Sequence, residues 1–417
     1  MSHEITEPGR AVVYNLPSAF SDTLRTLQFE QFFSGYEGSA FCVRTLDGWS
    51  WSSSGLRNPE FVAIFRTRDA LDAVVGDAKE ATLGRIFLEG GLEIQGNIFV
   101  LLSAAEYTLR HSEGLSNSLI QNVGRISMDV SRRLIHGRKS SASHNWLCTP
   151  CPLDLPVEFF EPWLGAYLGH FCGDFRERDE DFATAQQNGL ERACRLLELG
   201  GCDRLLDVGC GWGSLLLYAA EHYGANSRGI SSSGLQVQAA EDRICRRGLA
   251  WKCSVESRDL RTAPFRAQAF DKITHLGIFE QAPFSDLGKY LACMQKMLVP
   301  GGMLLLDRMT RTRDCGPLAR SINLGLPAEP LSKELEVAEC AGFELIAADS
   351  LRDEYEQTMR IWIEHLLRNW MGESSRPFCR GYRTWLLYLV GVAASMRAEE
   401  LQVHRILLRR PRCERAA

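Results

Sequence analysis

Apolar runs alternate with amphipathic stretches along the second half of the chain. Five runs fit buried strands, at residues 204–208, 227–230, 251–255, 270–276 and 303–306. Segments with helical spacing of apolar positions separate them, at 214–223, 234–247 and 287–298. Strands that alternate with helices in this way are typical of a parallel, doubly wound α/β sheet. Such a sheet binds its ligand at the carboxyl ends of its strands, so we expect the loops that follow the strands to face one another there.

The N-terminal part has a different pattern. Short apolar runs at 41–44 and 49–51 flank Asp47-Gly48, which predicts a hairpin, and 61–65 fits a buried strand. We predict a small α+β domain over 1–123 and the α/β domain over 157–417. Between them, residues 124–156 are polar and basic, which suits a solvated linker or a contact with anionic lipid.

Composition narrows the class of protein. The 417 residues are 45% hydrophobic and 24% charged, as in ordinary globular proteins, and the net charge of −5 gives no case for nucleic acid. No apolar run is long enough to cross a bilayer, and the start of the chain lacks an apolar signal core, so we expect a cytoplasmic protein. Of the 14 cysteines, only Cys148 and Cys151 form a Cys-x-x-Cys pair, and no second pair follows at zinc-ribbon distance. We therefore predict no metal site.

A glycine-rich loop follows the first strand of the α/β domain. The stretch 205–213 is LLDVGCGWG, with glycine at the first, third and fifth positions of the loop. A dinucleotide site requires glycine at the sixth position, where this chain has Ser214, and an acidic residue near position 229, which is missing. This spacing, with Asp207 two residues before the first glycine, favours S-adenosylmethionine as the ligand.

Several motifs together resemble the cyclopropane-fatty-acyl-phospholipid synthase family of S-adenosylmethionine-dependent enzymes. They occur in the family's order, at residues 84–98, 170–175, 207–213, 229–236, 277–280, 355–362 and 383–389. The resemblance implies a Rossmann-like class I methyltransferase domain preceded by a small lipid-binding-like domain. It further implies transfer of a methyl(ene) group to a double bond of an unsaturated phospholipid acyl chain, which forms a cyclopropane through a carbocation. The family often forms homodimers and works at the membrane surface, so peripheral binding to the inner face is expected.

The resemblance also assigns site residues. Glu280, Cys172 and Tyr355 match the family's bicarbonate site, where the bound ion accepts a proton from the substrate. The backbone of Gly209, Cys210 and Gly211 is expected near the amino-acid part of the cofactor. The remaining cofactor-binding residues that we expect are Phe171, Asp207, Ser231, Gln236, Glu256 and Ser257.

One departure from the family concerns the chemistry itself. A histidine that binds bicarbonate in the family is replaced by Asp307, in the stretch LLD at 305–307. An ionised aspartate donates no hydrogen bond and repels an anion, which argues against bicarbonate binding. Asp307 could be protonated beside Glu280, it could itself be the base, or the chain could make another product. We hypothesise that Asp307 is the base.

Two other functions remain open from sequence. One is C-methylation that leaves a methyl or methylene group or acts on a non-lipid alkene. The other is an inactive lipid- or cofactor-binding homologue, which the substitutions in the motifs suggest. His170 and Asp174 are two such substitutions, because they replace aromatic residues of the family motif.

Overall fold

The computed structural model describes residues 18–53, 58–76, 86–100, 155–177, 179–258, 260, 264–277, 284–312, 328–370, 379–397 and 399–412. Its contacts divide the chain into two compact units. We call Met1–Val75 with Gly91–Gly114 the N-terminal unit, and Gly76–Gly90 with Leu115–Ala417 the C-terminal unit. The linker predicted at 124–156 lies outside the described residues, apart from positions 155 and 156.

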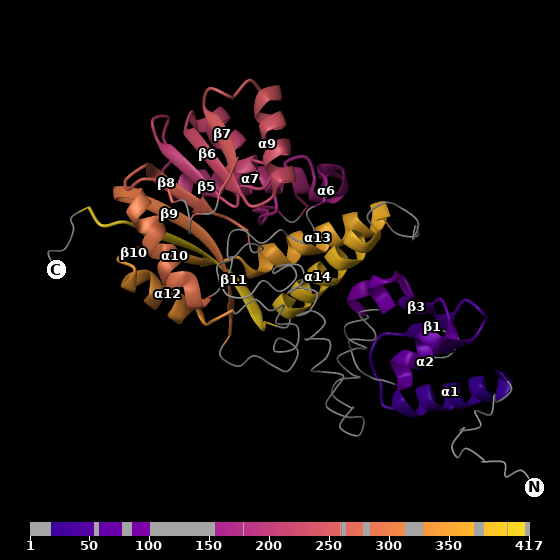
Figure 1. Cartoon of the computed structure of the whole chain (residues 1–417). Coiled ribbons are helices and arrows are strands. Elements are labelled where there is room, and N and C mark those ends of the chain that lie inside the picture. The colour runs from indigo at the N-terminus through magenta and orange to yellow at the C-terminus, as the bar shows by residue number, and fades with distance from the viewer. Residues whose placement is uncertain are drawn as a thin grey trace, which may run out of the picture. The chain divides into compact units, whose positions relative to one another are not determined.

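The described part of the N-terminal unit contains a four-stranded sheet and the helices α1 and α2 (Figure 1). Its strand order is β2-β1-β3-β4, and its elements are α1 (Ser18–Phe32), β1 (Phe41–Thr45), β2 (Ser50–Ser52), β3 (Phe61–Phe65), α2 (Arg68–Gly76) and β4 (Leu92–Gly96). The predicted hairpin around Asp47-Gly48 is confirmed, since β1 pairs antiparallel with β2. Aromatic rings form much of the core, where Phe41 stacks on Phe61 with ring centroids 5.0 Å apart.

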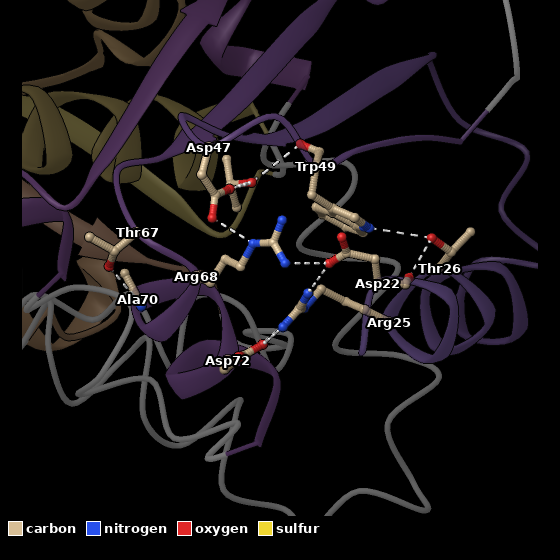
Figure 2. A network of polar contacts seen from close by, with 10 residues as sticks. Asp22, Arg25, Thr26, Asp47, Trp49, Thr67, Arg68, Ala70 and Asp72 are labelled. Atoms are coloured by element: carbon tan, nitrogen blue, oxygen red, sulfur yellow. Dashed lines mark hydrogen bonds and ion pairs between the residues drawn. The ribbon is translucent and has the colours of Figure 1, made fainter. Parts of the chain in front are cut away.

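An ion-pair network connects the helices α1 and α2 to the hairpin (Figure 2). Arg25 of α1 donates to Asp72 of α2 at 2.9 and 2.6 Å and to Asp22 at 2.9 Å. Arg68 of α2 donates to Asp22 and to Asp47 beside the hairpin turn. The carboxylates neutralise both guanidinium groups, so the network stabilises the unit rather than offering free charge to a ligand.

The C-terminal unit is built on a seven-stranded sheet with the order β10-β11-β9-β8-β5-β6-β7. Five strands are mutually parallel: β5 (Arg204–Val208), β6 (Asn226–Ser231), β7 (Cys253–Ser257), β8 (Phe270–His275) and β9 (Leu298–Arg311). The five predicted strands are thus confirmed, although β9 is much longer than the predicted 303–306. Because these strands are parallel neighbours, the loops that follow β5, β6, β7 and β8 leave the same edge of the sheet.

The helices cover both faces of this sheet, as a doubly wound fold requires. On one face, α10 (Phe284–Met297) and α12 (Leu331–Cys340) pack on the core. On the other face lie α7 (Phe182–Leu196), α8 (Ser214–Tyr218), the π-helix η2 (Ala219–Tyr223) and α9 (Gly234–Arg246). Alternation along β9 places Leu305 on the α7 face and Leu306 on the α10 face. Asp307 therefore points to the α7 face, and Arg308 points to the α10 face.

The end of the chain makes the sheet mixed rather than wholly parallel. Strand β11 (Leu401–Arg409) lies between β9 and β10 (Glu344–Ser350) and runs antiparallel to both. Between β10 and β11 the chain forms α13 (Arg352–Trp370) and α14 (Cys379–Arg397), which lie side by side in Figure 1. Helix α6 (Val157–Leu164) packs against α13. None of the helices in the described part has both the length and the apolar character needed to cross a bilayer.

Candidate active site

The glycine loop leaves β5 and is tied to the neighbouring strand. The backbone N–H groups of Gly209 and Cys210 both donate to the carbonyl of Ile230, at 2.9 and 3.0 Å. Gly211 has a φ of +54°, and a Cβ added there would meet nothing within 4 Å. The loop is therefore held in place where it leaves β5, and it has free space around Gly211. A ligand can approach the backbone closely at that position. This geometry fits the methionine part of S-adenosylmethionine.

Asp207 lies below this loop as a buried carboxyl. Thr274 Oγ1 donates to Asp207 Oδ1 at 2.7 Å. Burial raises the pKa of Asp207 to about 7, and the Thr274 hydrogen bond partly opposes that shift. An ammonium group bound nearby would favour the ionised form. The amino group of S-adenosylmethionine would supply that charge, so the residue fits the cofactor.

The ends of β6 and β7 carry the residues expected near the ribose and adenine. Ser231 Oγ donates to Gln236 Oε1 at 2.7 Å, which joins the end of β6 to the first turn of α9. The strand register places Ser257 opposite Ser231. Glu256 is partly exposed and pairs with Arg258 at 3.0 Å. The fold thus gathers these four expected cofactor residues at one edge, next to the glycine loop.

Phe171 has a different environment from the other expected cofactor residues. Its ring is buried in the core between α7 and the sheet, in the same cluster as Leu190, Leu205 and Leu215. The following residue, Cys172, is also buried, and the next N–H, of Gly173, donates to Thr358 Oγ1 of α13 at 3.0 Å. A Cβ on Gly277 would lie only 2.7 Å from the carbonyl of His170, so the glycine lets this segment approach the end of β8.

Three of the four expected catalytic residues come together on the α7 face. Tyr355 Oη, from the first turn of α13, donates to Asp307 Oδ2 at 3.4 Å, and so does the backbone N–H of Gly277 at 3.4 Å. Cys172 is buried as well, and the Asp307 carboxylate contributes to the raised pKa of its thiol. The fourth residue, Glu280, lies outside the described residues, as does the Cys148/Cys151 pair.

Asp307 has a partner that the sequence did not indicate. Arg405 of β11 stands directly opposite Asp307 of β9 in the antiparallel register. Its Nε and Nη2 lie 2.8 and 2.9 Å from the two carboxylate oxygens, and the side chains are 3% and 0% exposed. The two hydrogen bonds make this a bidentate pair, the geometry in which a guanidinium holds a carboxylate most tightly. A lone arginine in an apolar strand gives no signal of such a partner, because the pairing depends on how β11 inserts into the sheet.

Two of the groups around Asp307, the thiol of Cys172 and the phenol of Tyr355, are neutral. Burial raises the pKa of the Cys172 thiol well above its usual value, and the Asp307 carboxylate adds to the rise. The pKa of Tyr355 is raised for the same two reasons. Burial disfavours the charge on Arg405, but Asp307 outweighs it and the pKa of Arg405 rises. The cluster therefore holds one carboxylate, one guanidinium, one thiol and one phenol, with no net charge.

A cluster of aromatic rings, which we call the aromatic cluster, lies where the glycine loop meets the helices α6, α13 and α14. Trp212 of the loop lies 4.7 Å from Phe160, and Phe160 lies 5.6 Å from Trp385, measured between ring centroids. His170 stacks on Trp362 at 4.8 Å. Burial lowers the pKa of His170 to about 3, so this ring is neutral. Aromatic faces attract cations, so the aromatic cluster suits a reaction that passes through a positively charged intermediate.

Among the described residues, no group of three His, Cys, Asp or Glu side chains is arranged as a metal site. The described parts of the site combine an open glycine loop, the aromatic cluster and a buried acid–base cluster.

Comparison with known proteins gives a consistent result. The family model described as mycolic acid cyclopropane synthetase matches residues 150–406, which is more than half of the chain. A probable fatty acid methyltransferase of Pseudomonas putida is 28% identical over 338 residues, covering 79% of this chain and 82% of that protein. The cyclopropane-fatty-acyl-phospholipid synthase of Escherichia coli K12 is 26% identical over 274 residues, covering 65% and 69%.

Among solved structures, the cyclopropane synthase MmaA2 from Mycobacterium tuberculosis superposes with a TM-score of 0.57 at 23% identity. The match covers 65% of this chain and all of that one, and it supports the class I methyltransferase fold. The glycine loop and the family match agree on S-adenosylmethionine as the cofactor. The chain belongs to the mycolic acid cyclopropane synthetase family of S-adenosylmethionine-dependent methyltransferases.

Proposed function

We propose that this protein transfers a methyl group from S-adenosylmethionine to a double bond of an unsaturated phospholipid acyl chain and then closes a cyclopropane ring. The observation that carries the proposal is the acid–base cluster of Asp307, Tyr355 and Cys172, together with the aromatic cluster, to which His170, two residues before Cys172, belongs. Methylation of an alkene creates a carbocation, and ring closure then requires loss of one proton. The site offers aromatic faces for the cation and a carboxylate for the proton.

Each part of the site has a task in this reaction. S-adenosylmethionine, when bound, supplies an electrophilic methyl group on a sulfonium. The glycine loop and Asp207 hold its amino-acid part, and Ser231, Gln236, Glu256 and Ser257 hold its nucleoside. The aromatic cluster excludes water, which would otherwise react with the carbocation and give an alcohol. Asp307 accepts the proton, and the Glu280 carboxylate offsets the positive charge of the carbocation.

Two observations favour a second product. Asp307 replaces the family histidine, and the Pseudomonas putida relative, matched over 82% of its length, is named a fatty acid methyltransferase. A base placed differently would remove a different proton from the same carbocation. The product would then be a methyl- or methylene-branched chain instead of a ring.

The lipid substrate implies a membrane partner. We propose that the protein binds peripherally to the inner face of the membrane and acts as a homodimer. The predicted 1–123 domain would handle the lipid, and the basic residues of 124–156 would contact anionic headgroups. Sedimentation with and without vesicles of anionic phospholipid would test both the binding and the oligomeric state.

The function is tested with the full chain, S-adenosylmethionine and vesicles of an unsaturated phospholipid. We expect the acyl chains to gain the mass of one CH₂ group, and proton NMR to show whether that group is a ring or a branch. Glu280→Gln should abolish the gain. A small soluble alkene that is methylated while the vesicles are not would contradict the lipid assignment. Cofactor binding without any methylated product would indicate an inactive homologue.

A further inference from the structure

The ion pair between Asp307 and Arg405 is built into the sheet. Because the two residues are direct register partners on neighbouring strands, the backbone ladder fixes the separation of their side chains. Both arginine contacts fall within 2.9 Å, and the pair is almost completely buried. The carboxylate is therefore held in one orientation before any substrate arrives.

In the family that the chain resembles, the residue at the position of Asp307 is a histidine that binds bicarbonate. A guanidinium fork binds one planar carboxylate or bicarbonate in bidentate fashion, and Asp307 already fills the fork of Arg405. A second anion beside Asp307 would meet a buried negative charge at short range. The Asp307 carboxylate on β9, oriented by Arg405 of β11, can thus take the place of a bound anion.

Tyr355 gives the carboxylate a route for the proton. Its hydroxyl donates to Asp307 Oδ2, and both side chains are buried. When the substrate C–H bond breaks, its electron pair forms the new carbon–carbon bond and its proton passes to Tyr355 Oη. The original hydroxyl proton of Tyr355 moves at the same time to Asp307 Oδ2. Tyr355 ends unchanged, Asp307 ends protonated, and Arg405 keeps its charge.

Pairing with Arg405 also suits a base that works next to a carbocation. A proton beside a cationic carbon is strongly acidic, so the base need not be strong. A free carboxylate could instead attack the cation and form an ester. Two hydrogen bonds from Arg405 hold both oxygens of Asp307 and restrain that side reaction.

We propose that Arg405 is a positioning residue that makes Asp307 an internal substitute for bicarbonate, with Tyr355 as the proton relay. This inference rests on the proposed function. It adds that catalysis is independent of bicarbonate, and it assigns a role to a residue that the sequence motifs leave out.

The first test uses the unchanged protein. Methyl transfer to phospholipid vesicles is measured in buffer stripped of carbon dioxide and again after bicarbonate is added. We expect equal rates. Product that forms only with bicarbonate would overturn this inference and leave the proposed function intact. No product in either buffer would contradict the proposed function, and this inference with it.

The second test asks whether Arg405 recruits an anion once Asp307 is removed. Asp307→Ala should lose about 100-fold or more in kcat, the usual contribution of a general base, and formate should restore part of it. Asp307→Asn keeps the volume of the side chain, so formate should not restore its activity. In Asp307→Ala/Arg405→Met the formate rescue should disappear. Rescue that persists in the double variant, or an Asp307→Ala protein that keeps most of its activity, would overturn the proposal.

A matched control stands on the same strand. Arg308 pairs with Glu334 at 2.9 Å on the opposite face of β9, with side chains 4% and 1% exposed. Glu334→Gln breaks the ion pair of Arg308, which is next to Asp307 on β9 and is similarly buried. This variant therefore controls for the stability lost when a buried pair is broken. Its activity should show neither formate stimulation nor bicarbonate dependence. Titration of each variant with S-adenosylmethionine will show that the cofactor site is folded, and the wild-type test holds even where a variant does not fold.

Discussion

Thr274 and Asp207 face each other across β8 and β5, where the threonine hydroxyl donates to the buried carboxyl at 2.7 Å. The hydroxyl is the polar contact that offsets part of the cost of burying a carboxylate beneath the glycine loop. The pKa of about 7 makes Asp207 sensitive to small changes near neutral pH.

We expect the affinity for S-adenosylmethionine to rise as pH increases through about 7. Below that pH Asp207 is protonated and must lose its proton to pair with the cationic amino group, so affinity should fall by up to about tenfold per pH unit. The rise should stop where the cofactor's own amino group deprotonates, at a pKa of about 7.7–8.0. Calorimetric titration at several pH values checks this, and Asp207→Asn should bind weakly without the rise.

The hydrogen bond from Thr274 can be tested separately. Thr274→Val removes the contact that lowers the pKa of Asp207, so the binding profile should move to higher pH. Thr274→Ser keeps the hydroxyl and serves as the matched control. Identical profiles for Thr274→Val and the unchanged protein would show that Asp207 does not control cofactor binding.

The same raised pKa affects folding stability. Asp207 keeps its proton up to about pH 7 in the folded protein, whereas the unfolded chain loses it near the ordinary value of 3.8. The folded state therefore binds more protons between these values, and stability should fall as pH rises across that window. Asp207→Asn carries no such charge, so its melting temperature should fall less between acidic and neutral pH. A larger fall in the variant would contradict the assignment.

Breaking the Asp307–Arg405 pair from one side should be costly. Arg405→Met leaves a buried carboxylate without its cation, so we expect a loss of about 3–5 kcal/mol in unfolding free energy. Asp307→Leu/Arg405→Met removes both charges and should be more stable than Arg405→Met. Thermal unfolding of the two variants measures the difference. Equal stability of single and double variants would mean that the charges do not interact as the geometry indicates.

His170 should act through its ring and not through a charge. Its pKa of about 3 keeps the imidazole neutral at working pH, and it stacks on Trp362. His170→Phe should therefore keep most of the methyl transfer rate, whereas His170→Ala should lose up to about 2 kcal/mol of transition-state stabilisation, or roughly 30-fold. Rate measurements on the two variants decide this. A His170→Phe protein as impaired as His170→Ala would point to a hydrogen-bonding role for the imidazole.

Arg25 should matter for the N-terminal unit alone. Arg25→Met removes hydrogen bonds to Asp22 and Asp72 and should cost about 1–3 kcal/mol in the stability of that unit. Affinity for S-adenosylmethionine should not change, because the expected cofactor residues belong to the other unit. Arg66→Met breaks an exposed pair with Glu93 and should cost no more than about 1 kcal/mol. Limited proteolysis, read together with cofactor titration, separates the two effects.

The parallel part of the sheet could be predicted because its signal is local. Strand β5 was predicted at its observed bounds, and the helix expected at 214–223 forms, although its second half is a π-helix. Strands β10 and β11 were not predicted. Their apolar positions do not distinguish a strand from a helix. Their pairing partners are far apart in sequence, so the pairing leaves no local pattern. The wholly parallel sheet expected from sequence is for that reason a mixed one.

The sequence by itself determined the family, the cofactor loop and the presence of an aspartate where the family has a histidine. Short-range spacing carries that information, because glycines, strand patterns and motif order are properties of neighbouring residues. Only the tertiary structure decided what surrounds Asp307. Strand β11 enters the sheet next to β9 and brings Arg405 opposite a residue 98 positions away. Whether a buried carboxylate is a neutral acid or a paired base depends on the charge beside it, and that charge comes from register rather than from local sequence.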